Sequence, residues 1–275
     1  MALGSCIRSF LNCIHPVIVV DETNLHEKYK GMLLIATCID GNNKIYPIAF
    51  SIVDGENDAS WTWFMTHLKA SIGDVLNLVI ILDRYISIAK VVARIFPCAF
   101  HAPCIYHIQN NLVDKFKNKN IIPYFYLAPK AYKMSNFQIY WAKLHQYPGV
   151  TAYLEEVGLQ RWARVYQVHC RHDKMTTNIV ESLNRVLKDA RELPITKLLE
   201  HIHEWLQGWF YIQRIHAMAC TNIVPDYAMS ILKESELISR TYHVSPMDMY
   251  IINVDDGYLG GLVDLSFTDM YVHEV

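Results

Sequence analysis

Several features that would assign a chain to a special class are missing from this sequence. It has no Cys-x-x-Cys pair, and its seven cysteines are odd in number and scattered along the chain. It has no apolar run of about 18 residues, no low-complexity tract and no internal repeat. These absences argue against a disulfide scaffold, a transmembrane helix, a disordered chain and a repeat protein. We expect a reduced intracellular compartment and no cleavable signal peptide.

What the chain does have is enough apolar material for a large core. Its 275 residues are 52% hydrophobic, which suits one large α/β domain or one domain with an insertion. The net charge of −2 hides an uneven distribution, because residues 226–275 carry nine acids and two bases. Residues 112–145 carry six lysines and one acid, which is either an ordinary solvated face or a basic patch for a phosphate backbone.

Hydrophobic periodicity predicts a mixed sheet with helices packed against it. Pro47 favours a sheet edge or a bulge, and Asp58 or Ser60 is the expected cap of the helix that follows. Residues 118–175 break the alternation and predict a helical insertion, and the acidic tail predicts a small β element. The expected strands are 17–20, 31–38, 44–53, 76–82 and 98–101, joined in part by a turn at 40–43, and the expected helices are 58–69, 86–96, 104–117, 176–191 and 194–218.

Three carboxylates stand at positions suited to hold hard cations. Asp21 and Asp83 each end an apolar run, and Glu181 lies on the predicted helix 176–191. Mg²⁺ prefers oxygen ligands, and two such ions about 3.5–4 Å apart can drive in-line displacement at a phosphodiester. From spacing alone each acid is more simply a turn or surface residue. Neighbouring strand ends and a helix laid across the sheet would nevertheless bring all three together.

The helix with Glu181 carries two cations at helical spacing. Glu181, Arg185 and Lys188 stand at i, i+4 and i+7, and therefore share a predicted face. Arg185 and Lys188 are candidate DNA contacts beside a bound metal. The simpler interpretation is a Glu–Arg pair on a solvated helix, worth a few tenths of a kcal/mol.

Cys104 and His107 form a Cys-x-x-His motif at the predicted start of a helix. A structural zinc site needs four ligands, and no second pair stands at a suitable spacing. We therefore predict no structural zinc, and an interior packing or hydrogen-bonding pair is the simpler interpretation.

Several of these segments resemble the conserved blocks of plant Mutator-like element (MULE) transposases, and they occur in the family's order. Arg191 to Ile195 also resembles the end of the third-acid block. The other matching strings are residues 17–31 (VIVVDETNLHEKYKG), 40–50 (DGNNKIYPIAF), 53–64 (VDGENDASWTWF), 82–88 (LDRYISI), 96–107 (FPCAFHAPCIYH) and 178–184 (NIVESLN).

The resemblance implies an RNase H-like fold and a DDE transposase that uses two Mg²⁺ or Mn²⁺ ions to cut element ends and join them to target DNA. Asp21, Asp83 and Glu181 match the catalytic and metal-binding acids, and Cys104 and His107 match the family's Cys-x-x-His motif. The implied location is the nucleus, the implied partner is DNA, homo-oligomerisation is possible, and no membrane is involved. The domain limits that follow are a first core part at 1–117, an insertion at 118–175, a second core part with the Glu181 helix at 176–225, and an acidic segment at 226–275 that leads toward an absent SWIM zinc finger.

Two departures from the family pattern leave the activity open. Glu22 stands where members usually have Gly, and its side chain is expected to point away from Asp21 on a strand. Tyr85 replaces a usual His. Together with the absent SWIM zinc finger, these departures indicate a truncated or degenerate copy that keeps all three acids. The alternatives are a domesticated, non-catalytic protein that binds DNA or regulates transcription, and a decayed sequence without a function.

Overall fold

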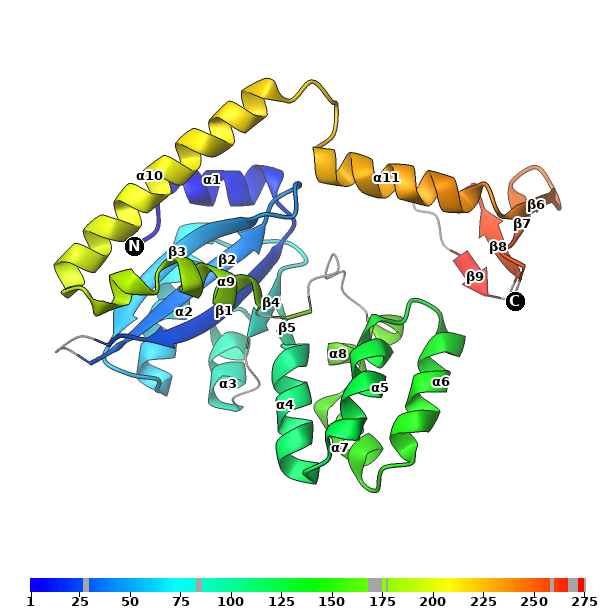
Figure 1. Cartoon of the computed structure of the whole chain (residues 1–275), viewed down its shortest axis with the longest axis horizontal. Coiled ribbons are helices and arrows are strands. Elements are labelled where there is room, and N and C mark those ends of the chain that lie inside the picture. The colour runs from blue at the N-terminus through cyan, green and yellow to red at the C-terminus, as the bar shows by residue number, and fades with distance from the viewer. Residues whose placement is uncertain are drawn as a thin grey trace. The chain divides into compact units, whose positions relative to one another are not determined.

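A five-stranded mixed sheet organises the larger part of the computed structural model (Figure 1). The structure describes residues 1–26, 30–82, 86–167, 175–176, 178–257, 260–266 and 272–274. The chain divides into two units, Met1–Met218 and Ala219–Val275, and each is described by itself. The predicted limits near 117, 175 and 225 are not tested by this division and stay predictions.

The sheet of the first unit has the strand order β3-β2-β1-β4-β5. β1 pairs antiparallel with β2, and β2 pairs antiparallel with β3, whereas β1, β4 and β5 run parallel. The predicted α/β class with a mixed sheet is confirmed, and this arrangement is compatible with an RNase H-like fold. The strands are β1 (Val17–Asn24), β2 (Met32–Ile39), β3 (Ile45–Val53), β4 (Val79–Leu82) and β5 (Phe100–Pro103).

Turn chemistry and a proline shape the edge formed by β2 and β3. The Asp40 carboxylate accepts hydrogen bonds from the backbone N–H groups of Asn42 and Lys44, at 2.9 and 2.8 Å. This closes the predicted turn. Pro47 lies on edge strand β3, where the register with β2 shifts between Ala36 and Thr37. The predicted edge or bulge position of Pro47 is confirmed. Proline favours such positions because it has no N–H group to donate to a neighbouring strand.

Helices cover both faces of the sheet and bury a separate core on each. On one face α1 (Gly4–Cys13), α2 (Asp58–Ile72) and α3 (Ile86–Ile95) pack against β-strand residues such as Ile18 and Ile80. On the other face α9 (Asn178–Val186) and α10 (Ile195–Ala219) pack against Val19 and Ile81. Figure 1 shows α9 lying across β1 and β2. The two faces are therefore distinct environments for any side chain on β1.

A group of helices between β5 and α9 has its own core, which includes Phe125, Phe137 and Trp162. We call residues 105–166 the helical subdomain. The Trp162 indole N–H donates to the Leu154 carbonyl at 3.0 Å. Arg161 lies within 3.0 Å of a ring nitrogen of His101 on β5, and this contact joins the subdomain to the sheet. Its elements are α4 (Ile105–Phe116), η1 (Lys119–Ile121), α5 (Ile122–Leu127), η2 (Ala128–Lys130), α6 (Met134–His145), α7 (Val150–Val157), α8 (Leu159–Trp162) and η3 (Arg164–Tyr166).

The second unit consists of a helix and a small antiparallel sheet of order β6-β7-β8-β9. The expected β element is confirmed at β7 and β8. In the parts of the chain that the structure describes, no helix has both the length and the apolar character needed to cross a bilayer. The elements are α11 (Asp226–Ser239), β6 (His243–Pro246), β7 (Ile251–Asp255), β8 (Gly260–Asp264) and β9 (Val272–Glu274).

Four local expectations were wrong. The helix α1, which precedes the first predicted strand, was not expected. The helix α11 was not expected at all. The cap of α2 is Asn57 rather than Asp58 or Ser60, because the Asn57 side chain accepts from the Ser60 N–H at 2.9 Å. The helix expected over 176–191 ends at Val186 and is followed by a turn and the 3-10 helix η4 (Asp189–Glu192).

Candidate active site

Asp21 is a buried acid in the middle of the sheet. Its residue is 8% exposed, and it is the one charged residue among those described that is buried. Burying a carboxylate is costly unless it is paired, hydrogen-bonded or bound to a metal. A position that retains such a group is therefore a candidate for function.

The strand register places Asp21 where its neighbour β4 ends. Val19 pairs with Ile81 in the parallel β1–β4 ladder, and β4 ends at Leu82. Asp21 lies two residues beyond the last such pair and remains paired with Ile35 of β2 on its other side. The predicted adjacency of the two strands is confirmed. Asp83 follows Leu82 in the sequence and lies outside the described residues.

Asp21 belongs to the face of the sheet that α9 covers. Side chains alternate along a strand, so Asp21 shares its face with Val17 and Val19. Those valines pack in one core with Val180 and Leu183 of α9. Glu181 lies on α9, although its side chain is outside the described part of the structure. The helix of the third predicted acid therefore crosses the same face as the first.

Glu22 faces the other side of the sheet. It pairs with Leu34 of β2, and Leu34 packs in the core beneath α2 and α3. The expectation that Glu22 points away from Asp21 is confirmed by this alternation. The Glu22 and Asp21 carboxylates therefore lie on opposite faces of the sheet.

A single arginine ties the segment after α9 to the end of β1. The Arg191 guanidinium donates to the Thr23 hydroxyl and, at 3.2 Å, to the Asn24 carbonyl. The backbone N–H of His26 donates in return to the Arg191 carbonyl at 3.1 Å. These contacts fix η4 beside the strand that carries Asp21. The resemblance singled out residues 191–195 as part of a block, but their role was not predicted.

The two predicted DNA-contacting cations, Arg185 and Lys188, are both exposed. Arg185 lies in the last turn of α9. Lys188 lies beyond the end of the helix, in the turn before η4, and its backbone keeps α-helical dihedral angles (φ −53°, ψ −54°). Their role as DNA contacts stays a prediction.

The Cys-x-x-His motif begins next to the end of β4. Cys104 is fully buried, immediately precedes α4, and its backbone N–H donates to the Leu82 carbonyl at 3.0 Å. His107 is half-buried in the first turn of α4. Within the described residues, no three His, Cys, Asp or Glu side chains gather as a metal-binding group. Asp83 and the Glu181 side chain lie outside those residues.

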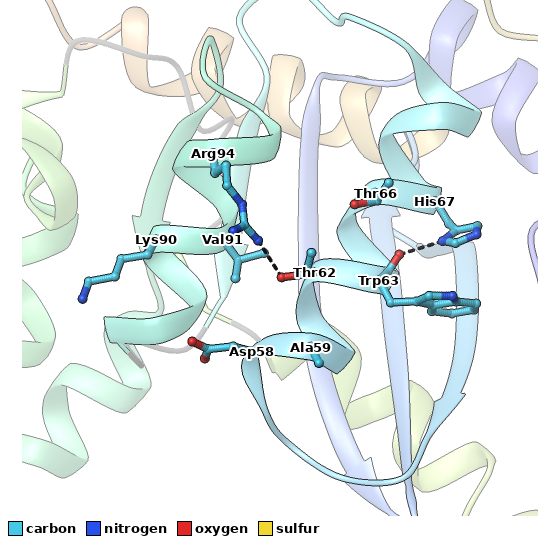
Figure 2. A pocket seen from close by; sticks show the side chains of 9 residues that line it. All are labelled: Asp58, Ala59, Thr62, Trp63, Thr66, His67, Lys90, Val91 and Arg94. Carbon is cyan, nitrogen blue, oxygen red and sulfur yellow. Dashed lines mark hydrogen bonds between the residues drawn. The ribbon is translucent and has the colours of Figure 1, made fainter.

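A groove of about 760 Å³ between α2 and α3 lies on the opposite side of the sheet from α9 (Figure 2). Arg94 crosses it and donates to the Thr62 hydroxyl at 2.8 Å. Figure 2 shows Lys90 pointing away from α2, while Trp63 and His67 lie together on the other side of that helix. The polar groups do not converge on one point, so the groove does not form a catalytic constellation.

One comparison with known proteins covers the strand that carries Asp21. Residues 17–111 match the family model of the MULE transposase domain, and this segment contains β1, β4 and the Cys-x-x-His motif. No curated protein matched the chain. Among solved structures, the chain is similar to a chain in a cryo-EM structure of the simian T-cell lymphotropic virus intasome in complex with the PP2A regulatory subunit B56 gamma. The identity is 12% and the TM-score 0.27, over 47% of this chain and 48% of that chain. A likeness this weak adds nothing to the argument, which rests on the family match.

Proposed function

We propose that this chain is the catalytic domain of a MULE-type transposase of the DDE class, which cleaves DNA at element ends and transfers the strands to target DNA. The family match over residues 17–111 supports the transposase assignment. The observation that carries the catalytic proposal is the buried Asp21, which lies beside the end of β4 and faces α9.

The donor chemistry fits a pair of divalent cations. Asp21 is a hard oxygen ligand on a rigid central strand, and it is buried on the face that the Glu181 helix covers. We propose that Asp21, Asp83 and Glu181 would hold two Mg²⁺ or Mn²⁺ ions. Bound there, two such ions would activate a water or a 3′-hydroxyl and stabilise the leaving oxygen.

The chain's own residues would supply position and polarity. The three carboxylates are proposed to fix the cations relative to the scissile phosphate, and the central strand keeps Asp21 from moving. Arg185 and Lys188 are proposed to contact DNA phosphates beside the site. The nuclear location, the plant-type relationship and homo-oligomerisation are parts of the same proposal.

The test is cleavage and joining of labelled double-stranded DNA with Mg²⁺ or Mn²⁺. We expect metal-dependent products from the unaltered chain and none from Asp21→Asn or Asp83→Asn. Glu22→Gln is the matched control, because it removes an adjacent charge from the opposite face. If the folded, unaltered chain binds DNA but yields no product with either metal, the catalytic proposal fails. A domesticated DNA-binding or regulatory protein would then be the better account.

A further inference from the structure

The helical subdomain carries an excess of positive charge, and beyond α4 its acids are confined to one helix. Residues 117–167 contain seven lysines and arginines and two glutamates. Both glutamates, Glu155 and Glu156, lie on α7. Residues 117–167 therefore carry a net positive charge of five, which favours an anionic partner.

Two of the cations are stacked on exposed tyrosines around η2 and η3. The Lys130 ammonium lies 3.4 Å from the centre of the Tyr126 ring, and the Arg164 guanidinium lies 4.0 Å from that of Tyr132. The segments η2 and η3 are in contact, so these pairs belong to one region. We call Tyr126, Lys130, Tyr132, Lys133 and Arg164 the cation–aromatic cluster.

The tyrosines of this cluster do not serve the core of the subdomain. Tyr132 is 73% exposed and Tyr126 is 53% exposed, whereas the core aromatics such as Phe125 and Trp162 are fully buried. A ring beneath a cation restricts the cation's side chain at a gain of about 0.5–1 kcal/mol at exposed sites. The cations are therefore held in place on the surface before any partner arrives, which lowers the entropic cost of binding.

We propose that the cation–aromatic cluster binds the phosphate backbone of double-stranded DNA. This inference rests on the proposed function, which makes DNA the substrate. Cations that contact phosphates position DNA without reading its sequence, and Arg and Lys are the usual donors. The contact between Arg161 and His101 ties the subdomain to β5, so the cluster is carried on the same unit as the candidate active site.

The experiment measures the affinity for a labelled duplex as a function of salt, with EDTA present so that cleavage plays no part. Each neutralised phosphate contributes about 0.9 to the slope of log K against log salt. The variant Lys130→Gln, Lys133→Gln, Arg164→Gln should lower the magnitude of that slope by about 2–3. The control variant Arg8→Gln, Lys44→Gln, Lys90→Gln also removes three cations, from other parts of the unit, and should change the slope by less than about 1.

A second pair of variants tests the role of the ring. Tyr132→Phe keeps the ring under Arg164 and should bind like the unaltered chain, whereas Tyr132→Leu should bind several-fold more weakly at an unchanged melting temperature. Equal slopes for the two triple variants would overturn the inference, as would binding of poly-glutamate as tight as that of DNA. If the unaltered chain cleaves no DNA but the two triple variants still differ in salt slope, only the proposed catalytic function fails. The two failures can therefore be told apart.

Discussion

Arg191 joins the segment after the Glu181 helix to the strand of Asp21, and its removal gives the sharpest test of how the site is held. Arg191→Ala deletes the donors to the Thr23 hydroxyl and to the Asn24 carbonyl. The main-chain hydrogen bond from His26 to residue 191 remains possible. The variant therefore loosens the connection without removing it.

The size of the effect is the balance of two contributions, the hydrogen bonds that are lost and the buried donor that is removed. A hydrogen bond to a charged group is worth about 1.5–3 kcal/mol, and less where it is partly exposed, as at this half-buried residue. Against this, the Arg191 Nε is buried without a hydrogen-bond partner among the described residues, and alanine relieves that cost of about 1–3 kcal/mol. We expect a net loss of about 1–2 kcal/mol in unfolding free energy, which is about 2–8 °C in melting temperature for a unit of this size.

The effect on activity should exceed the effect on stability. Thr23 and Asn24 follow Asp21 by two and three residues, so a looser contact displaces the two candidate acids relative to each other. Misplacement by about 1 Å costs about 100-fold in rate. We expect metal-dependent cleavage to fall by about 10- to 100-fold, measured well below the melting temperature.

The assay compares three variants by thermal unfolding, DNA cleavage and hydrogen exchange of the α9 amides. Arg8→Ala is the control, because it removes an exposed arginine from α1, which packs on the opposite face of the sheet from α9. Arg191→Lys keeps the charge but not the planar fork, and it should give an intermediate result. If Arg191→Ala melts, exchanges and cleaves like Arg8→Ala, the reasoning is refuted.

Three further predictions concern the sheet and its surroundings. Glu22→Gln should cleave DNA at a rate within about twofold of that of the unaltered chain, because Glu22 lies on the opposite face from Asp21. A cleavage assay that shows a loss as large as that of Asp21→Asn would contradict this. Gly31→Ala should lower the unfolding free energy by about 1–3 kcal/mol in urea titrations, because the added Cβ would lie 2.7 Å from the Val53 carbonyl oxygen, and an unchanged midpoint would contradict it. Burial raises the pKa of the Cys6 thiol to about 11, so Cys6 loses its proton at a lower pH in the unfolded chain than in the folded chain. The free energy of unfolding should therefore fall between about pH 9 and 11. Unfolding curves of Cys6→Ala should show a smaller fall, and an equal fall would contradict the assignment.

The sequence predicted the sheet well because its signals are local. Alternation and apolar runs marked the strands, and the turn at Asp40 needs only groups within four residues. The acids Asp21 and Glu22 were correctly assigned to opposite faces, since the period of a strand is two. A similar local cue placed Pro47 at an edge with a bulge.

The missed features depend on contacts between residues far apart in the sequence. The end of α9 at Val186 precedes a segment held by Arg191, whose partners Thr23 and Asn24 lie 168 and 167 residues away. The helix α11 has no buried residue, so no apolar stripe identified it. In α1 only Cys6 and Phe10 are buried, which is too short a pattern to recognise.

The central claim is that Asp21, Asp83 and Glu181 hold two metal ions on the α9 face of the sheet. A crystal structure with Mn²⁺ and a DNA duplex, recorded at the manganese absorption edge, tests it most directly. We expect two anomalous peaks about 3.5–4 Å apart, each contacted by at least one of the three carboxylates. Carboxyl groups more than about 10 Å apart, or manganese bound only elsewhere, would contradict the claim.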